Sequence, residues 1–221
     1  MRNTINLKEE QKKSLARPRL KYSLAARIFF LLLDLITGKK VTLSKTKLIE
    51  TLASIPYRAW ENRLYMKLTR NYRSEEKIKK YKEIMQWGRD AQDNEYYHLV
   101  VINAKMKEDG QKDAWYLYQP VPFLIVLFYR IFSAFMAFFY IKGAFLFNAE
   151  FEDHAEHVYA QFVEENPQWD EESVKSKIVK EYGDFENWGE VFRRIGLDER
   201  EHRNNSFIFA GQEDMVVDTD Y

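Results

Sequence analysis

Hydrophobic residues recur at the three-to-four-residue spacing of α-helices over most of this chain of 221 residues. No stretch of useful length alternates between hydrophobic and polar positions as a half-buried strand would, so the pattern predicts an all-α protein. Ser74 followed by two glutamates is typical of a helix start, and Gly38 followed by two lysines is typical of a helix end. The predicted helices cover residues 21–37, 44–70, 74–107, 171–182 and 187–209, together with a long helical stretch that begins at Pro120 and continues without a strong break through residues 148–166.

Two of these segments are far more apolar than the rest. Residues 21–37 have few polar positions, and in residues 120–147 the only charged residues are Arg130 and Lys142. The second segment meets the crude length criterion for a helix that crosses a membrane. Its continuation, however, carries Glu152, which the chemistry discussed below requires inside the protein. We therefore expect both segments to lie in one leaflet of a membrane, in contact with lipid, and keep a spanning helix as the alternative.

Composition excludes several classes of function. The 34 basic residues equal the 34 acidic ones, so the formal net charge is zero and no nucleic-acid partner is expected. The absence of cysteine excludes disulfides, thiolate metal sites and thiol switching. The first twenty residues are highly charged and include Glu9 and Glu10, which is wrong for a transit peptide. A bacterial inner membrane is therefore the favoured location, and an organellar membrane is the alternative for a eukaryotic protein.

The expected organisation is one large domain with two short appendages. Hydrophobic residues make up 46% of the chain, which is enough for one buried core with apolar surface left over. We expect a charged extension at residues 1–19, a helical domain over residues 20–210 and an acidic, flexible tail over residues 211–221.

Six metal-ligating residues have the spacing of a di-metal site inside a four-helix bundle. Two predicted helices each carry a Glu-x-x-His pair, whose two side chains share one helix face. A lone glutamate lies on a predicted helix before each pair, which is the ligand set of ferritin-like di-iron proteins. Four carboxylates would balance the charge of two ferrous ions, so two iron ions are the expected cofactor. In chain order, the six residues are Glu50, Glu95, His98, Glu152, Glu199 and His202.

Other readings of these residues remain open. A single Glu-x-x-His pair is usually a polar pair on a solvated helix face, and only the repetition of the pattern argues against that reading here. His154 and His157 could form a rival metal group with Glu150 or Glu156. Glu156 also lies one turn beyond Glu152 on the same helix face, which makes it the main rival for that ligand position.

At these residues the chain resembles the alternative oxidase family, the di-iron quinol oxidases of mitochondria, plastids and bacteria. The resemblance extends over about residues 20–209, and the third and fourth motifs are more similar to the plastid terminal oxidase branch. The four family motifs are matched, in chain order, by Ile49-Glu50-Thr51 with Pro56, by Asn94-Glu95-Tyr96-Tyr97-His98, by Phe151-Glu152-Asp153-His154-Ala155 with Tyr159, and by Asp198-Glu199-Arg200-Glu201-His202.

The resemblance implies a ferritin-like four-helix bundle with a di-iron core and apolar, membrane-facing helices. It implies a membrane-bound enzyme that oxidises quinol to quinone and reduces O2 to water without pumping protons. The six residues would be iron ligands, and Tyr159 would be the tyrosine near the metals that donates an electron or a proton. Asn94 and Asp198 match positions that orient ligating histidines. Lys45 stands where the family usually has an arginine of the quinol pocket, which makes Lys45 a candidate for contact with quinol.

Two other functions fit the same ligands. A di-iron hydroxylase or desaturase would modify a lipid or a quinone, and a ferritin-like protein would bind iron without a quinol substrate. The partners expected for an oxidase are quinol, O2 and membrane lipid, and a homodimer is left open.

Overall fold

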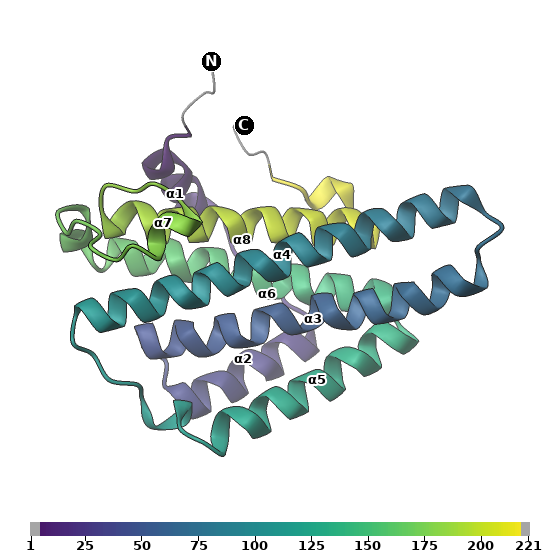
Figure 1. The fold of residues 1–221 in the computed structure, drawn as a ribbon, viewed down its shortest axis with the longest axis horizontal. Helices are drawn as coiled ribbons and strands as arrows, with labels where there is room; N and C mark the ends of the chain where they lie inside the picture. The colour runs from purple at the N-terminus through teal and green to yellow at the C-terminus, as the bar shows by residue number, and fades with distance from the viewer. Residues whose placement is uncertain (1–4, 218–221) are drawn as a thin grey trace.

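The computed structural model describes residues 5–217, and its secondary structure over that range consists of helices joined by loops. The prediction of an all-α protein is confirmed, since Ser173 and Asn187 form one isolated bridge and no strand occurs among the described residues. Figure 1 shows long helices lying side by side. The helices are α1 (Leu7–Ala16), α2 (Leu24–Thr37), α3 (Leu43–Arg70), α4 (Glu75–Glu108), α5 (Val121–Phe139), α6 (Ile141–Glu164), α7 (Val179–Tyr182) and α8 (Trp188–Ala210), with short 3-10 turns η1 (Trp115–Leu117), η2 (Pro167–Asp170) and η3 (Glu213–Met215).

Four helices, α3, α4, α6 and α8, form the central bundle. Helix α3 packs along α4 and α6 packs along α8, and the two pairs meet where α3 contacts α6 and α4 contacts α8. Three of the four begin with a side-chain cap, in which Thr42, Ser74 or Asn187 accepts a hydrogen bond from the backbone N–H three residues later. The helix starts, and with them the inward-facing positions, are therefore fixed by local sequence.

Helices α2 and α5 lie together along one edge of the molecule, away from α8 (Figure 1). The rings of Phe29 and Tyr129 join them, with centroids 5.2 Å apart. Helix α5 is long and apolar enough to cross a bilayer, and only about 17% of its apolar stretch is buried inside the protein. The exposed hydrophobic side chains, called here the α2–α5 apolar face, are Leu24, Ile28, Leu31, Leu32 and Leu35 on α2, and Phe123, Leu124, Leu127, Phe128, Ile131, Phe135, Phe138 and Phe139 on α5.

The long apolar run is broken at Tyr140, so the predicted continuous helix from Pro120 onward is wrong. Tyr140 has φ −145° and ψ 70°, outside the helical region, and separates α5 from α6. The ring of Tyr140 folds back onto Gly143, where an added Cβ would lie 2.1 Å from the ring. Gly143 is therefore needed for this close approach, and the break lets α6 enter the bundle while α5 stays outside.

The predicted helix over residues 171–182 is also wrong in extent, because only Val179–Tyr182 is helical. The Glu108 carboxylate accepts hydrogen bonds from the backbone N–H groups of Lys175, at 3.1 Å, and Ser176, at 2.8 Å. These bonds hold the preceding residues in a non-helical path across the end of α4.

Both ends of the chain pack against the bundle. The charged N-terminal segment forms α1, which lies on α6 and α8 and buries Glu10 and Ser14. At the other end, Asn204 Nδ2 of α8 donates to the backbone oxygen of Val217 at 2.7 Å. Residues 1–4 of the expected extension and residues 218–221 of the expected flexible tail lie outside the described residues.

Candidate metal centre

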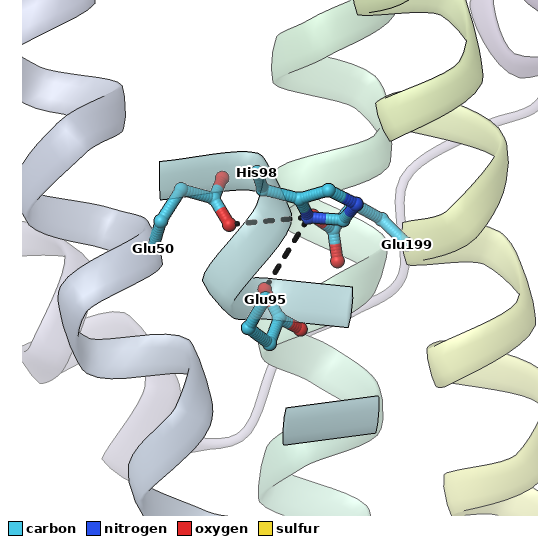
Figure 2. Close-up of side chains that lie close together, drawn as sticks. All are labelled: Glu50, Glu95, His98 and Glu199. Carbon is cyan, nitrogen blue, oxygen red and sulfur yellow. Dashed lines mark ion pairs between the residues drawn. The ribbon is translucent and has the colours of Figure 1, made fainter. Parts of the chain in front are cut away.

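The six predicted ligands meet inside the central bundle. Each is at most 6% exposed. Figure 2 shows four of them converging between the helices, with Glu50 on one side and Glu199 on the other. Helix α3 supplies Glu50, α4 supplies Glu95 and His98, α6 supplies Glu152, and α8 supplies Glu199 and His202.

The six residues form two overlapping groups of four. One group contains Glu50, Glu95, His98 and Glu199. The other contains Glu95, Glu152, Glu199 and His202. Within each group, one potential ligand atom of every residue lies within 4.8 Å of the others. Glu95 and Glu199 belong to both groups, which is the position that a carboxylate bridging two metal ions would occupy.

The histidine nitrogens point at the carboxylates. His98 Nδ1 lies 3.3 Å from Glu50 Oε2 and 3.2 Å from Glu199 Oε1. His202 Nδ1 lies 2.9 Å from Glu95 Oε1 and 3.3 Å from Glu199 Oε2. Each imidazole therefore presents Nδ1 to the centre of the cluster.

Several buried nitrogen and oxygen atoms of these six residues lack hydrogen-bond partners, as expected for atoms that would bind a metal ion. The ring nitrogens that face the carboxylates are within ion-pair distance, yet they make no hydrogen bond of acceptable geometry. Buried polar atoms are rarely left this way, because their desolvation is not compensated. Metal ions would supply the missing partners, and the donor set suits them. The unpartnered atoms are Glu50 Oε2, both carboxylate oxygens of Glu95, His98 Nδ1, Glu152 Oε2, Glu199 Oε2 and His202 Nδ1.

Burial and charge shift the pKa values of this cluster toward protonation. Burial, with the charges of Glu199 and Glu95, raises the pKa of Glu152 well above its usual range. Burial would lower the pKa of His202, but Glu95 and Glu199 raise it well above its ordinary value. For His98, the lowering by burial is likewise overcome by Tyr182 and nearby carboxylates. The metal-free cluster therefore holds protons that a metal must displace.

Metal binding should release protons, and metal affinity should rise with pH. A group that is protonated without metal and deprotonated with it binds metal more tightly as pH increases. Since the pKa values of His98 and His202 are raised above 6.5, affinity should still be increasing above pH 6.5. Calorimetric titration with Co²⁺ in two buffers of different ionisation enthalpy measures the protons released. Binding heats that do not depend on the buffer would contradict this prediction.

Two tyrosines donate hydrogen bonds to Glu50 and Glu152, the two glutamates that each belong to one ligand group only. Tyr159 donates a hydrogen bond from α6 to Glu50 on α3, and Tyr57 Oη donates from α3 to Glu152 Oε1 on α6 at 2.8 Å. Sequence analysis singled out Tyr159 and missed Tyr57 as a site residue. The sequence contains a signal for Tyr57, because Tyr57 follows Glu50 by seven residues just as Tyr159 follows Glu152. Asn148, also missed, donates to Glu152 Oε1 at 3.0 Å.

The predicted orienting residues lie behind His98. Asp198 Oδ2 is 3.2 Å from His98 Nε2, and Asn94 Nδ2 donates to the same oxygen at 3.2 Å. Tyr182, missed by sequence analysis, also donates to Asp198. Burial alone would raise the pKa of Asp198, but His98 and the Arg194 guanidinium hold it well below its usual range. An ionised Asp198 favours a proton on Nε2 and leaves Nδ1 free for a metal.

The rival residues are bound elsewhere. The Glu156 carboxylate contacts Arg17 and accepts a hydrogen bond from Arg200 Nε at 2.8 Å. His157 contacts the backbone oxygens of Asp153, at 2.7 Å, and of Arg17, at 2.9 Å. Neither residue belongs to the candidate metal groups, so the structure favours Glu152 over Glu156 at the ligand position.

His154 and Lys45 lie between α2 and the bundle. The ring of His154 stacks on Phe30 at 4.1 Å, and burial together with Arg19 and Lys45 lowers its pKa to about 3. Lys45 Nζ donates to Asp34 Oδ1 at 2.6 Å and to the backbone oxygen of Gly38 at 2.8 Å. Lys45 thus ties the end of α2 to α3, and its contact with quinol stays a prediction.

A cavity of about 300 Å³ lies beside the candidate metal centre and is lined by residues of α3, α4 and α5. Glu50 and Glu95 line it, together with Arg58 and Arg130. Arg130 is the only charged residue of α5. A small molecule in this cavity would lie next to Glu50 and Glu95, on one side of the candidate centre.

Comparisons with known proteins assign no family. No protein-family model matches the chain, and no curated protein is significantly similar to it. The geometry of the six buried residues is therefore the main observation from which a function can be argued.

Proposed function

We propose that the protein is a membrane-bound quinol:oxygen oxidoreductase with a non-haem di-iron centre. The observation that carries this proposal is the pair of overlapping ligand groups, in which Glu95 and Glu199 are shared. Carboxylate-rich sites of this kind with two imidazoles are the ligand set of di-iron proteins built in helical bundles. The motif resemblance to the alternative oxidase family supports quinol as the electron donor.

Two quinols would each give up two electrons and two protons, and one O2 would take up all four of each to form two waters. Bound iron ions would supply the redox chemistry by alternating between the ferrous and ferric states. The phenol of Tyr159, which donates a hydrogen bond to Glu50, would give a proton toward O2 at the centre. Burial, with Glu50 next to it, raises the pKa of Tyr159 well above its ordinary value, so the phenol keeps its proton until it is used.

The α2–α5 apolar face supports attachment to one leaflet of a membrane. It is an exposed surface rich in phenylalanine and leucine that soluble proteins rarely present to water. Helix α5 also packs along α3, so only its outer side is available to lipid. A helix that is covered by protein along one side and bare along the other suits an interfacial position better than an isolated crossing.

Membrane attachment should resist salt and yield to detergent. Burial of apolar area contributes about 25 cal/mol per Å² and does not depend on ionic strength, whereas attraction between charges weakens as salt rises. The measurement is the fraction of protein in the membrane pellet after washing with 1 M salt or with detergent. Replacing Leu35 and Phe128, two residues of the α2–α5 apolar face, by serine should increase the fraction of protein released without detergent. Release of the intact protein by salt alone would contradict the apolar-face argument.

The decisive experiment is oxygen uptake by the purified protein loaded with Fe²⁺, with a panel of quinols as donors. The oxidase reading predicts two iron ions per chain, quinone as the only organic product, and two quinols consumed per O2. An oxygenated or desaturated product would instead indicate the hydroxylase or desaturase reading. Iron uptake and oxidation without any quinol dependence would indicate iron storage.

A further inference from the structure

The N-terminal helix joins a buried ionic network on the outer side of the bundle. Arg200 Nε donates to Glu156 Oε1 at 2.8 Å, and its Nη2 donates to the backbone oxygen of Glu10 at 2.8 Å. Arg200 also contacts the Glu10 carboxylate. Ser14 Oγ donates to Glu156 Oε1 at 2.6 Å and accepts from Arg200 Nη2 at 3.0 Å. Helix α1 thus binds both α6 and α8 through this network.

This network attaches to α6 and α8 beside two candidate metal ligands. Glu156 lies one helical turn after Glu152, and Arg200 directly follows Glu199. Because successive residues of a helix point about 100° apart, Arg200 faces α1 while Glu199 faces the metal centre. A shift of either helix that disturbed the network would therefore move a ligand as well.

The network is tightly packed, with Lys13 also bound to Glu10 at its edge, so it has little freedom to adjust. Its carboxylates and guanidiniums are equal in number, and the cavity beside it has a volume of only about 10 Å³, too small to admit water freely. A buried guanidinium that loses its carboxylate is strongly unfavourable, and the helices would have to separate to hydrate it. The carboxylates are Glu10, Asp153 and Glu156, and the guanidiniums are Arg17, Arg200 and Arg203.

We propose that α1 is a positioning element of the metal centre. Glu10 and Ser14 hold Arg200 and Glu156 together, and this fixes α6 and α8 in the register that brings Glu152 and Glu199 to the metal. The inference rests on the proposed di-metal centre and adds that the N-terminal segment controls how firmly the centre retains its ions.

The test compares two neighbouring glutamates of α1 in the full-length protein. Glu10 is 5% exposed and contacts Arg200 as well as Lys13, whereas Glu9 is 55% exposed and pairs with Lys12 at 2.9 Å. Glu10→Gln and Glu9→Gln remove the same charge from the same helix turn, so their difference reports the network. The measurement is the rate at which Fe²⁺ passes from the loaded protein to an excess of a coloured chelator, at a temperature where circular dichroism shows both variants folded.

We expect Glu10→Gln to bind two Fe²⁺ per chain and to release them about tenfold faster than Glu9→Gln, the size typical of residues that orient metal ligands. If Glu10→Gln does not fold, Ser14→Ala keeps every charge and should raise the release rate at least about fivefold, because it loses hydrogen bonds to the charged groups of Glu156 and Arg200. Equal release rates, even with a lower unfolding midpoint for the variant, would show that α1 only anchors the chain and would overturn the inference.

The same experiment separates this inference from the proposed function. If the unsubstituted protein binds no Fe²⁺, the proposed metal centre fails and the positioning role fails with it. If the unsubstituted protein binds two Fe²⁺ per chain but the Glu9 and Glu10 variants behave alike, only the positioning role is wrong.

Discussion

Glu95→Ala is expected to yield a folded protein that binds no iron and oxidises no quinol. Glu95 belongs to both ligand groups, so its loss removes a ligand from each metal position at once. The remaining three carboxylates also no longer balance two ferrous ions. Elemental analysis gives the metal content, and oxygen uptake with a quinol donor gives the activity.

Asp93→Ala is the matched control, because Asp93 is an exposed carboxylate on the same helix, two residues away. It should keep both iron and activity. Glu152→Ala provides a graded comparison, since Glu152 belongs to one group only, and this variant should keep one ion per chain. Two ions per chain in Glu95→Ala would show that Glu95 is not a shared ligand.

Tyr159→Phe should keep its iron and its helix content but lose at least about a hundredfold in turnover, the size typical of a positioned proton donor. Only the phenolic hydroxyl is removed, and that hydroxyl donates to Glu50. The ring still packs beside Phe192, with centroids 6.3 Å apart, so the core should be preserved.

Tyr116→Phe is the control for this prediction, because Tyr116 is buried in a hydrophobic cluster that contains none of the candidate ligands. Its turnover should equal that of the unsubstituted protein. Iron content and circular dichroism are measured on the same samples as quinol-dependent oxygen uptake. Full turnover in Tyr159→Phe would leave Tyr159 as a packing residue.

The sequence was most informative where residues lie close together on one helix. The two residues of a Glu-x-x-His pair share one helix face, and two such pairs with two lone glutamates match the ligand set of a di-metal bundle. The set from Glu50 to His202 could therefore be assembled without knowing how the helices pack. The pattern could not show which carboxylates are shared between groups, nor that Tyr57 of α3 would bind Glu152 of α6. Those contacts depend on the register between helices, which short-range spacing does not encode.

Two further features were missed because their causes lie in tertiary structure. The break at Tyr140 depends on the fit of its ring against Gly143, within a run whose composition looks uniformly apolar. Helix α1 has few hydrophobic residues, and its packing relies on Glu10 and Ser14, polar residues that normally indicate a solvated surface. In both cases the partner of the residue, and not its own character, decides the structure.

The cavity beside the candidate centre makes its two halves unequal. Its walls include Glu50 and Glu95, whereas Glu152 and His202 are not among the residues that line it. We therefore expect a metal ion at the Glu50 and His98 position to exchange faster than an ion at the Glu152 and His202 position. Partial removal of metal should therefore accumulate a half-occupied protein in which the Glu152 and His202 position is filled. A second kind of ion added afterwards should enter the Glu50 and His98 position alone.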